Sequence, residues 1–408
     1  MIVRGGSLVS VALMLACWCP SLSAQLSRPG ATTPPRELPA IDDPGASADR
    51  EAEQPSRESF SFALSAAEDF ELPSGSWTDR VVGIPGPELV EKRGVPGLPT
   101  FTRTIGVQRK NYRFTMVGSD PFLARSGQVV VPFQIVPVRV VLNDGTALDP
   151  TLPGPECAGA GDPLTITLGS PLFADKDYGE GINRQYVEEN RRVEFWAVTA
   201  AHPGYSVRVA PIVLPTLTLT VNGPSQAAPC GRYVVLQFSA LDALLRTSVI
   251  PLLRKLGVSP RTFPLFLFSN VAVSDPRFGL AFGYHSAFNS GGIQTYGVAE
   301  YDTTQFDPNM LDVSVLAHEV AEWYDDPFIN NATPPWGNIG QVTGCQASLE
   351  VGDPLTGHHL EVAMPNGMTY HPQELAFFSW FFDQVPSLGL GGLYSWGGTL
   401  KSPASPCK

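Results

Sequence analysis

Long apolar runs separated by turn residues dominate the chain from Gln128 onward. The run QVVVPFQIVPVRVVLNDG (128–145) is rich in β-branched residues and ends in a turn, which predicts a strand. Because proline cannot donate a ladder hydrogen bond, Pro132 and Pro137 indicate an edge strand or a bulged one. Further runs predict strands at 164–168, 192–200, 216–221, 233–238, 263–273 and 291–302.

Two segments show helical spacing instead. The segment 241–257 (LDALLRTSVIPLLRKLG) places apolar residues three and four positions apart and ends at a glycine. The segment 307–327 (DPNMLDVSVLAHEVAEWYDDP) offers Asp307 as a cap, Pro308 for the first helical position and Pro327 as a stop. We therefore predict one helix over 308–325.

These elements predict an α+β fold in which a mixed, mostly antiparallel sheet packs on the helix at 308–325. A helical or irregular subdomain is expected at the C-terminus. No internal repeat is visible, and residues 128–408 are near the upper size for a single core.

The N-terminal third is predicted to contain three segments of different character. Residues 1–24 combine an early arginine, an apolar stretch and a small-residue exit, which is typical of a secretory signal peptide. A minor alternative is a lipoprotein cleavage box with Cys17 acylated. Residues 25–58 contain too little apolar surface to offset the entropy of ordering and are predicted to be a disordered linker. Residues 59–127 are either a pro-segment or an irregular wrap on the main domain.

Cysteine count and charge narrow the function classes. Four cysteines follow the leader, namely Cys157, Cys230, Cys345 and Cys407, and an even number in an exported chain suggests up to two disulfides. Of the three connectivities we favour Cys345 with Cys407, which closes a loop of about 60 residues. The net charge of −12 and the absence of a basic run argue against nucleic-acid binding. No segment after the leader is long and apolar enough to span a membrane, so we expect a secreted or periplasmic monomer.

The helix at 308–325 carries the most informative motif, HEVAE at 318–322. His318 and Glu322 are four residues apart and lie on one side of a helix, as two metal ligands do, while Glu319 is offset, where a general base faces bound water. A bland alternative is an amphipathic helix with a hydrogen-bonded histidine. Asp325 and Asp326 stand at the negative end of the helix dipole, so we expect a cation nearby, although Asp326 is equally explained by a turn.

Downstream residues supply further candidates. The segment TGCQASLEVGDPLTGHHLEV contains Glu350, 28 positions after Glu322 and a candidate third ligand, and Asp353, which we rank with Asp326 as a weaker one. Tyr370 and His371 precede an apolar helix-like stretch, where either side chain would polarise a substrate carbonyl.

These motifs together resemble exported bacterial proteins related to the zincin metallopeptidases. The likeness rests on residues 280–400: the HExxE helix followed by Asp-Pro, the later Glu-x-Gly-Asp, and TYHPQELAFFSWF. It implies a zincin-like fold in which the segments 284–288 (YHSAF) and 295–302 (TYGVAEYD) form the edge strand and the strand before the helix.

The resulting functional hypothesis is an exported metal-dependent hydrolase. We expect a peptidase that uses Glu319 as base on metal-bound water, with a polypeptide substrate and zinc as the ion. A ligand set rich in oxygen leaves manganese and calcium as alternatives. The alternative function is a non-catalytic zincin-fold or calcium-stabilised protein that binds an extracellular or cell-envelope partner.

Overall fold

A computed structural model describes residues 60–65, 97–123, 127–159, 161–405 and 407, and for 60–65 the backbone only. The predicted leader, the predicted linker and much of 59–127 lie outside these residues. All the described residues belong to one compact unit, Pro55–Lys408. No helix within them is long and apolar enough to cross a membrane.

The elements are as follows. The α-helices are α1 (Pro163–Leu168), α2 (Tyr186–Glu194), α3 (Trp196–Thr199), α4 (Phe238–Leu244), α5 (Ile250–Leu253), α6 (Ser314–Asp325) and α7 (Phe378–Phe381). The strands of the largest sheet are β1 (Phe60–Ser65), β4 (Gln128–Leu142), β5 (Ala147–Leu148), β8 (Ser206–Val213), β9 (Leu217–Asn222), β12 (Phe263–Ser269), β15 (Gly283–Asn289) and β16 (Ile293–Tyr301). The smaller sheets contain β2 (Thr100–Val107), β3 (Lys110–Val117), β6 (Lys176–Asp177), β7 (Asn183–Arg184), β10 (Gln226–Ala228), β11 (Gly231–Gln237), β13 (Val271–Asp275), β14 (Gly279–Ala281), β17 (Ala332–Ile339), β18 (Val342–Ser348), β19 (Val362–Ala363) and β20 (Thr369–Tyr370). A π-helical turn, Leu245–Val249, joins α4 to α5, and 3-10 turns cover Glu156–Ala158, Arg254–Leu256, Asp353–Leu355 and Leu390–Gly392.

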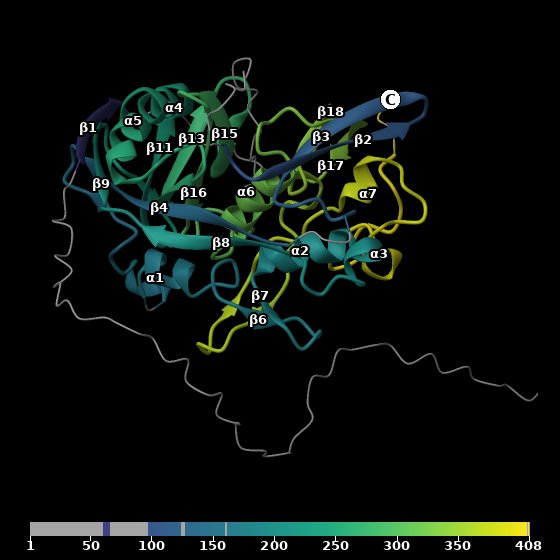
Figure 1. The fold of residues 1–408 in the computed structure, drawn as a ribbon. Coiled ribbons are helices and arrows are strands. Elements are labelled where there is room, and N and C mark those ends of the chain that lie inside the picture. Colours follow the sequence, from purple (N-terminus) through teal and green to yellow (C-terminus); the bar gives the residue numbers. More distant parts are fainter. Residues whose placement is uncertain (1–59, 66–96, 124–126, 160, 406, 408) are drawn as a thin grey trace, which may run out of the picture. The chain divides into compact units, whose positions relative to one another are not determined.

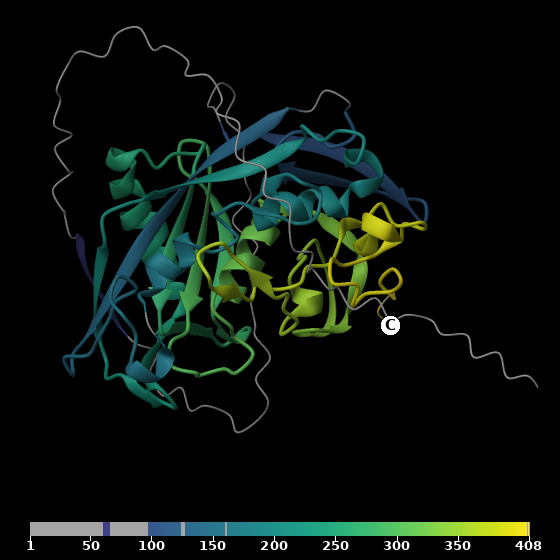
Figure 2. The ribbon, with the colours of Figure 1, turned by 90° about the horizontal axis from the view of Figure 1, so that it is seen from below.

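The largest sheet has the order β1-β9-β4-β12-β16-β15, and β8 also pairs with β4 (Figures 1 and 2). Its pairings are parallel, except that β15 runs antiparallel to β16 and β5 antiparallel to β4. Over all described strand pairs antiparallel pairings outnumber parallel ones, as expected for a mixed α+β protein, but the sheet that positions α6 is mainly parallel.

The strand β4 lies inside this sheet, so the prediction of an edge strand is wrong. Its neighbours are β12 on one side and first β8, then β9, on the other. The sheet accepts both prolines because pairing is incomplete beside each. Pro132 is paired only with β8, and Pro137 directly precedes the residue at which β9 takes over from β8.

Two predicted strands are helices. Residues 164–168 lie in α1, where Asp162 accepts a hydrogen bond from the backbone N–H of Thr165 and Pro163 occupies the first turn. Residues 192–200 lie in α2 and α3. A capping box formed by Gln185 and Glu188 starts α2, and every residue of α2 is buried. Its charged residues are buried in ion pairs, so the polar positions of α2 do not mark a solvent-exposed face.

The other predicted elements agree better with the structure. The segment 241–257 is helical from α4 through the 3-10 turn at Arg254–Leu256 and stops at Gly257, whose φ is 93°. The segments 216–221 and 233–238 overlap most of β9 and β11, and 263–273 contains β12 and most of β13. The segment 284–288 lies in β15, which is the edge strand of the described sheet, as predicted.

The helix α6 begins at Ser314, six residues later than predicted. Asp307 does not cap it, because its carboxylate accepts a hydrogen bond from the N–H of Asn309 in a local turn. The chain is held outside the helix by Asp312, which has a positive φ and whose carboxylate accepts hydrogen bonds from the backbone N–H of His371. The end of the helix, at Asp325, is as predicted.

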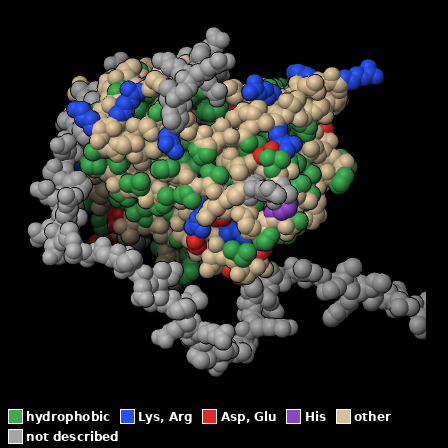
Figure 3. Space-filling model, viewed as in Figure 1, with side chains coloured by type: hydrophobic (Ala, Val, Ile, Leu, Met, Phe, Trp, Pro, Cys, Tyr) green, Lys and Arg blue, Asp and Glu red, His purple; other side chains and the backbone are tan. Residues whose placement is uncertain are grey.

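The helix α6 packs against β15 and β16 on one side and against the hairpin strand β3 on the other (Figure 1). The irregular C-terminal residues join the same core rather than forming a separate unit: Leu355, Tyr370 and Trp380 belong to one cluster with Phe114 and Trp323. In the space-filling view, acidic and basic side chains are scattered over the face drawn (Figure 3).

Two disulfides lie in the described chain. Cys345 pairs with Cys407, as predicted, and Cys157 pairs with Cys230, each with Cα atoms 5.9 Å apart. Both are compatible with an exported location.

Candidate metal centre

Six ionisable side chains meet in the interior beside α6: His285, His318, Glu319, Glu322, Glu350 and Asp353. We call them the α6 cluster. None is more than 3% exposed. Burying charges in this way is costly unless they are paired or hold an ion. The carboxyl groups of the cluster must therefore be paired with cations or carry protons.

One half of the cluster is centred on His318. Its Nε2 lies 3.0 Å from Oε1 of Glu322, one helical turn along α6, and 3.6 Å from Oδ1 of Asp353. Asp353 begins the 3-10 turn after β18. Its carboxylate accepts hydrogen bonds from the side-chain amides of Gln341 and Gln346. These amides hold one carboxylate oxygen toward the imidazole.

The tautomer of His318 follows from its other nitrogen. Nδ1 lies 3.1 Å from Oε1 of Gln373, whose Nε2 donates to the carbonyl oxygen of Gly352 at 2.7 Å. Because the amide nitrogen is used by Gly352, Gln373 presents its oxygen to the ring and accepts the Nδ1 proton. In the neutral ring the lone pair is then on Nε2, which faces the two carboxylates without a hydrogen bond to either. Without an ion, the raised pKa of His318 favours a proton on this nitrogen. Metal-binding histidines are oriented in this way.

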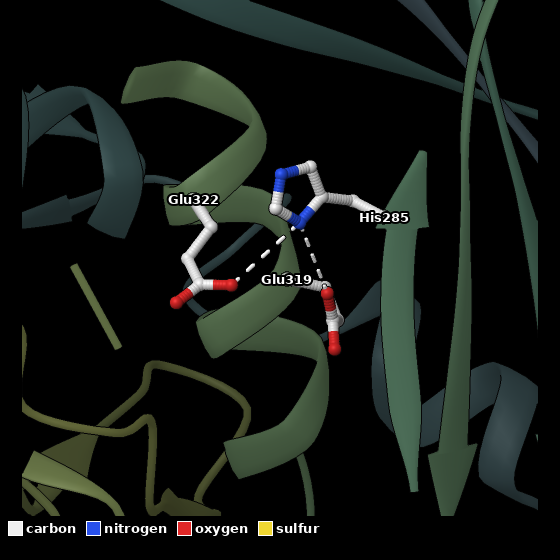
Figure 4. Close-up of side chains that lie close together, drawn as sticks. All are labelled: His285, Glu319 and Glu322. Atoms are coloured by element: carbon white, nitrogen blue, oxygen red, sulfur yellow. Dashed lines mark ion pairs between the residues drawn. The ribbon is translucent and has the colours of Figure 1, made fainter. Parts of the chain in front are cut away.

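The other half of the cluster is centred on His285, on the edge strand β15. Its Nδ1 lies 3.4 Å from Oε2 of Glu319 and 3.6 Å from Oε2 of Glu322 (Figure 4). These contacts are long for hydrogen bonds, and neither ring nitrogen of His285 has a hydrogen-bond partner. Both carboxylate oxygens of Glu319 also lack one.

The two halves form two possible ligand sets, His318–Glu322–Asp353 and His285–Glu319–Glu322, in each of which the ligand atoms lie within 4.8 Å of one another. Ligands about 2.0–2.2 Å from a tetrahedral ion are separated from one another by about 3.3–3.6 Å. The measured contacts of 3.0–3.6 Å lie close to this range. The histidine–carboxylate spacing of both sets is therefore compatible with a divalent cation.

Glu350 lies beside these sets but belongs to neither. Its carboxyl group neighbours those of Glu322 and Asp353, and its Oε2 lacks a hydrogen-bond partner. Burial raises the pKa of Glu350 well above its usual value, and the charges of Glu322 and Asp353 add to the rise. In the candidate set around His318, Asp353 stands where the sequence predicted Glu350.

The aspartates at the end of α6 are otherwise engaged. Asp326 accepts hydrogen bonds from the backbone N–H groups of Asn330 and Asn331 at 2.9 and 3.0 Å, which is the turn considered as the alternative from sequence. Asp325 pairs with the buried guanidinium of Arg191, from α2. Arg191 is thus the cation expected at this helix end.

The predicted carbonyl-polarising residues make other contacts. Tyr370 donates a hydrogen bond to the carbonyl oxygen of Ile166 at 3.1 Å, and His371 pairs with Asp312 at 2.7 Å through Nδ1. No described contact links either residue to the α6 cluster. Sequence reasoning missed His285, for which the only signal was a histidine inside an apolar strand.

Burial and mutual contacts shift the pKa values of the cluster. Burial raises the pKa of Glu319 to about 7 and that of Asp353 to about 6, although His318 opposes both shifts. Burial disfavours the charged form of His318, but Glu322, Asp353 and Glu319 together outweigh it, so the pKa of His318 lies well above its usual value. Without a metal ion the cluster holds protons, and protons and cations compete for the same atoms.

The cluster is closed to solvent in this conformation. A pocket of about 410 Å³ opens near the C-terminal end of α6, lined in part by Ile293, Phe328 and Asn330, and no cluster side chain lines it.

Comparison with known proteins gives no relative: no family model, no curated protein and no solved structure matches this chain.

Proposed function

We propose that this protein is a metal-dependent hydrolase, most simply an exported peptidase, with a divalent ion held by His318, Glu322 and Asp353. The observation that carries the proposal is the position of Nε2 of His318, which is buried and faces carboxylate oxygens of Glu322 and Asp353 at 3.0 and 3.6 Å without a hydrogen bond to either. One imidazole and two carboxylates suit zinc or manganese. Calcium is disfavoured because it takes oxygen ligands.

The arrangement of sheet and helix supports the resemblance to zincin metallopeptidases. The helix α6 packs under the edge strand β15, which runs antiparallel to β16 beside parallel strands. Among the described strands, β15 has no partner on its outer side. A peptide substrate that adds to this edge as an extra strand would pass close to α6.

The residues divide the chemistry as follows. A bound metal ion acidifies its water ligand. Glu319 lies next to the ion-binding set on α6 and faces β15, and its two oxygens have no hydrogen-bond partner. It is therefore placed to accept a proton from that water. Tyr370 and His371 are not needed for this step.

A second candidate function is favoured by the complete burial of the cluster. With every side chain at most 3% exposed, no substrate reaches the ion in this conformation. A closed ion would then stabilise a non-catalytic exported protein that binds an extracellular or cell-envelope partner through its surface.

Metal content and activity together distinguish the two functions. The protein, unfolded in chelator and refolded with zinc or manganese, should retain metal after gel filtration, and His318→Ala should lose the ion at this position. His358→Gln, which removes an exposed histidine, is the control. Glu319→Gln should keep the ion at the His318 position and lose cleavage of a mixed peptide library. Wild-type protein that retains metal and cleaves nothing between pH 5 and 9 would establish the structural alternative.

A further inference from the structure

Glu322 faces both halves of the α6 cluster with different oxygens. Its Oε1 lies 3.0 Å from Nε2 of His318 and accepts a hydrogen bond from the N–H of Gly352 at 3.1 Å. Its Oε2 lies 3.6 Å from Nδ1 of His285 and has no hydrogen-bond partner. The backbone N–H thus fixes the direction of a carboxylate that lies between two imidazoles. Figure 4 shows the side of this carboxylate that faces His285.

The second half of the cluster is also a candidate ion site. It offers one imidazole nitrogen and two carboxylate oxygens, the same donor set as the His318 half. The side chain of His285 is fully buried, points at Glu319 and Glu322, and lacks a hydrogen-bond partner on either nitrogen. Burial has removed the hydrogen bonds that this imidazole would make to water, and no described group replaces them.

The charge of the cluster is also consistent with more than one divalent cation. Glu319, Glu322, Glu350 and Asp353 carry four negative charges when ionised, and one divalent ion leaves two of them uncompensated. Among the described ion pairs, none joins these carboxylates to a lysine or arginine. Two divalent cations neutralise the four carboxylates with both imidazoles uncharged.

We propose that the α6 cluster is a two-metal centre in which the carboxylate of Glu322 bridges the ions. The first ion is the one of the proposed function, on which this inference rests. The second is held by Nδ1 of His285, Oε2 of Glu319 and Oε2 of Glu322. Carboxylate-rich two-metal sites of hydrolases hold their ions about 3.5–4 Å apart. Manganese and zinc are the ions that fit this donor set.

A second ion changes the task of Glu319. As a ligand it no longer receives the proton of water, and that water is activated between the two ions instead. A Glu319→Gln variant would lose activity in either case. Activity alone therefore cannot distinguish one ion from two, and the number of ions must be measured directly.

The test is the manganese content and the electron paramagnetic resonance spectrum of the full chain refolded with Mn²⁺ after unfolding in chelator. Wild type should bind two Mn²⁺ per chain with a spin-coupled spectrum. His285→Gln should bind one, with the spectrum of an isolated ion, and His358→Gln, the control for removal of an exposed histidine, should bind two. Glu319→Gln provides a second variant that preserves side-chain shape and should also bind one.

The outcomes separate the two proposals. Wild type with one ion, unchanged in His285→Gln and Glu319→Gln, would overturn the two-metal centre and leave the proposed function intact. Two coupled ions without any hydrolysis would support the two-metal centre and refute the hydrolase. No bound ion in wild type would refute both.

Discussion

Replacing Gly352 by alanine would test whether the ring of His318 is held where the structure places it. A Cβ on Gly352 would lie 2.5 Å from Cγ and Nδ1 of His318 and 2.6 Å from Cδ2. Ordinary contacts begin at 3.4 Å, so the ring must move by about 1 Å. The backbone itself accepts alanine, because Gly352 has φ −82° and ψ −39°. The effect is therefore steric.

The magnitude follows from the overlap with a buried ring. Overpacking of this kind costs about 1–3 kcal/mol of unfolding free energy. A ligand displaced by about 1 Å should also weaken metal binding, by about 10- to 100-fold if it compares with the loss of an outer-shell partner. Gly204→Ala is the matched control: its Cβ meets nothing within 4 Å and should leave stability nearly unchanged.

A double-mutant cycle isolates the contact. Chemical denaturation of metal-free Gly352→Ala should show the loss in the wild-type background and little loss in His318→Ala, where the ring is absent. Equal costs in both backgrounds, or a Gly352→Ala protein as stable and as tight for zinc as Gly204→Ala, would show that His318 does not occupy this position.

Three further predictions concern the surroundings of the cluster. Cys407→Ser opens a disulfide with a sequence separation of 62 and should cost about 4 kcal/mol in the chain-entropy model, measured by denaturant unfolding; a loss below about 1 kcal/mol would contradict it. Arg191→Met leaves Asp325 buried without its cation and should lower the free energy of unfolding by about 3–5 kcal/mol. The double variant Arg191→Met/Asp325→Asn should recover part of this loss, and no recovery would exclude the ion pair. Burial raises the pKa of Glu319 to about 7 and that of Asp353 to about 6, so folded metal-free protein binds more protons than unfolded protein between about pH 4 and 7. Its thermal stability should fall as pH rises through this range, and a rise would contradict the assignment.

The sequence predicted those elements in which the order of apolar and polar side chains matches the buried and exposed faces. The alternation and the apolar runs of β9, β12 and β16 involve residues that are close together in the sequence. The same is true of the spacing that places His318 and Glu322 on one side of α6. The start of α6 was missed because it depends on Asp312, whose partner His371 is 59 positions away.

The grouping of side chains at the candidate site was predicted only where it is local. Glu319, His318 and Glu322 come from one helical turn, and Asp353 was ranked as a weaker ligand than Glu350 because sequence does not show which carboxylate a turn presents. His285 could not be found from spacing, since strand β15 brings it to α6 only through sheet pairing and packing of the helix beneath. Long-range register of this kind leaves no periodic signal in the chain.

The burial of the α6 cluster also determines when an ion can enter or leave. With none of the six side chains more than 3% exposed, exchange with solvent requires local opening of the packed strands and helix around them. An ion bound during folding would therefore be kinetically trapped, and a chelator added to the native protein would remove it at the rate of that opening. The identity of the metal would then be decided by which cations are abundant in the compartment where the chain folds, rather than by equilibrium affinity in the medium where the protein later works.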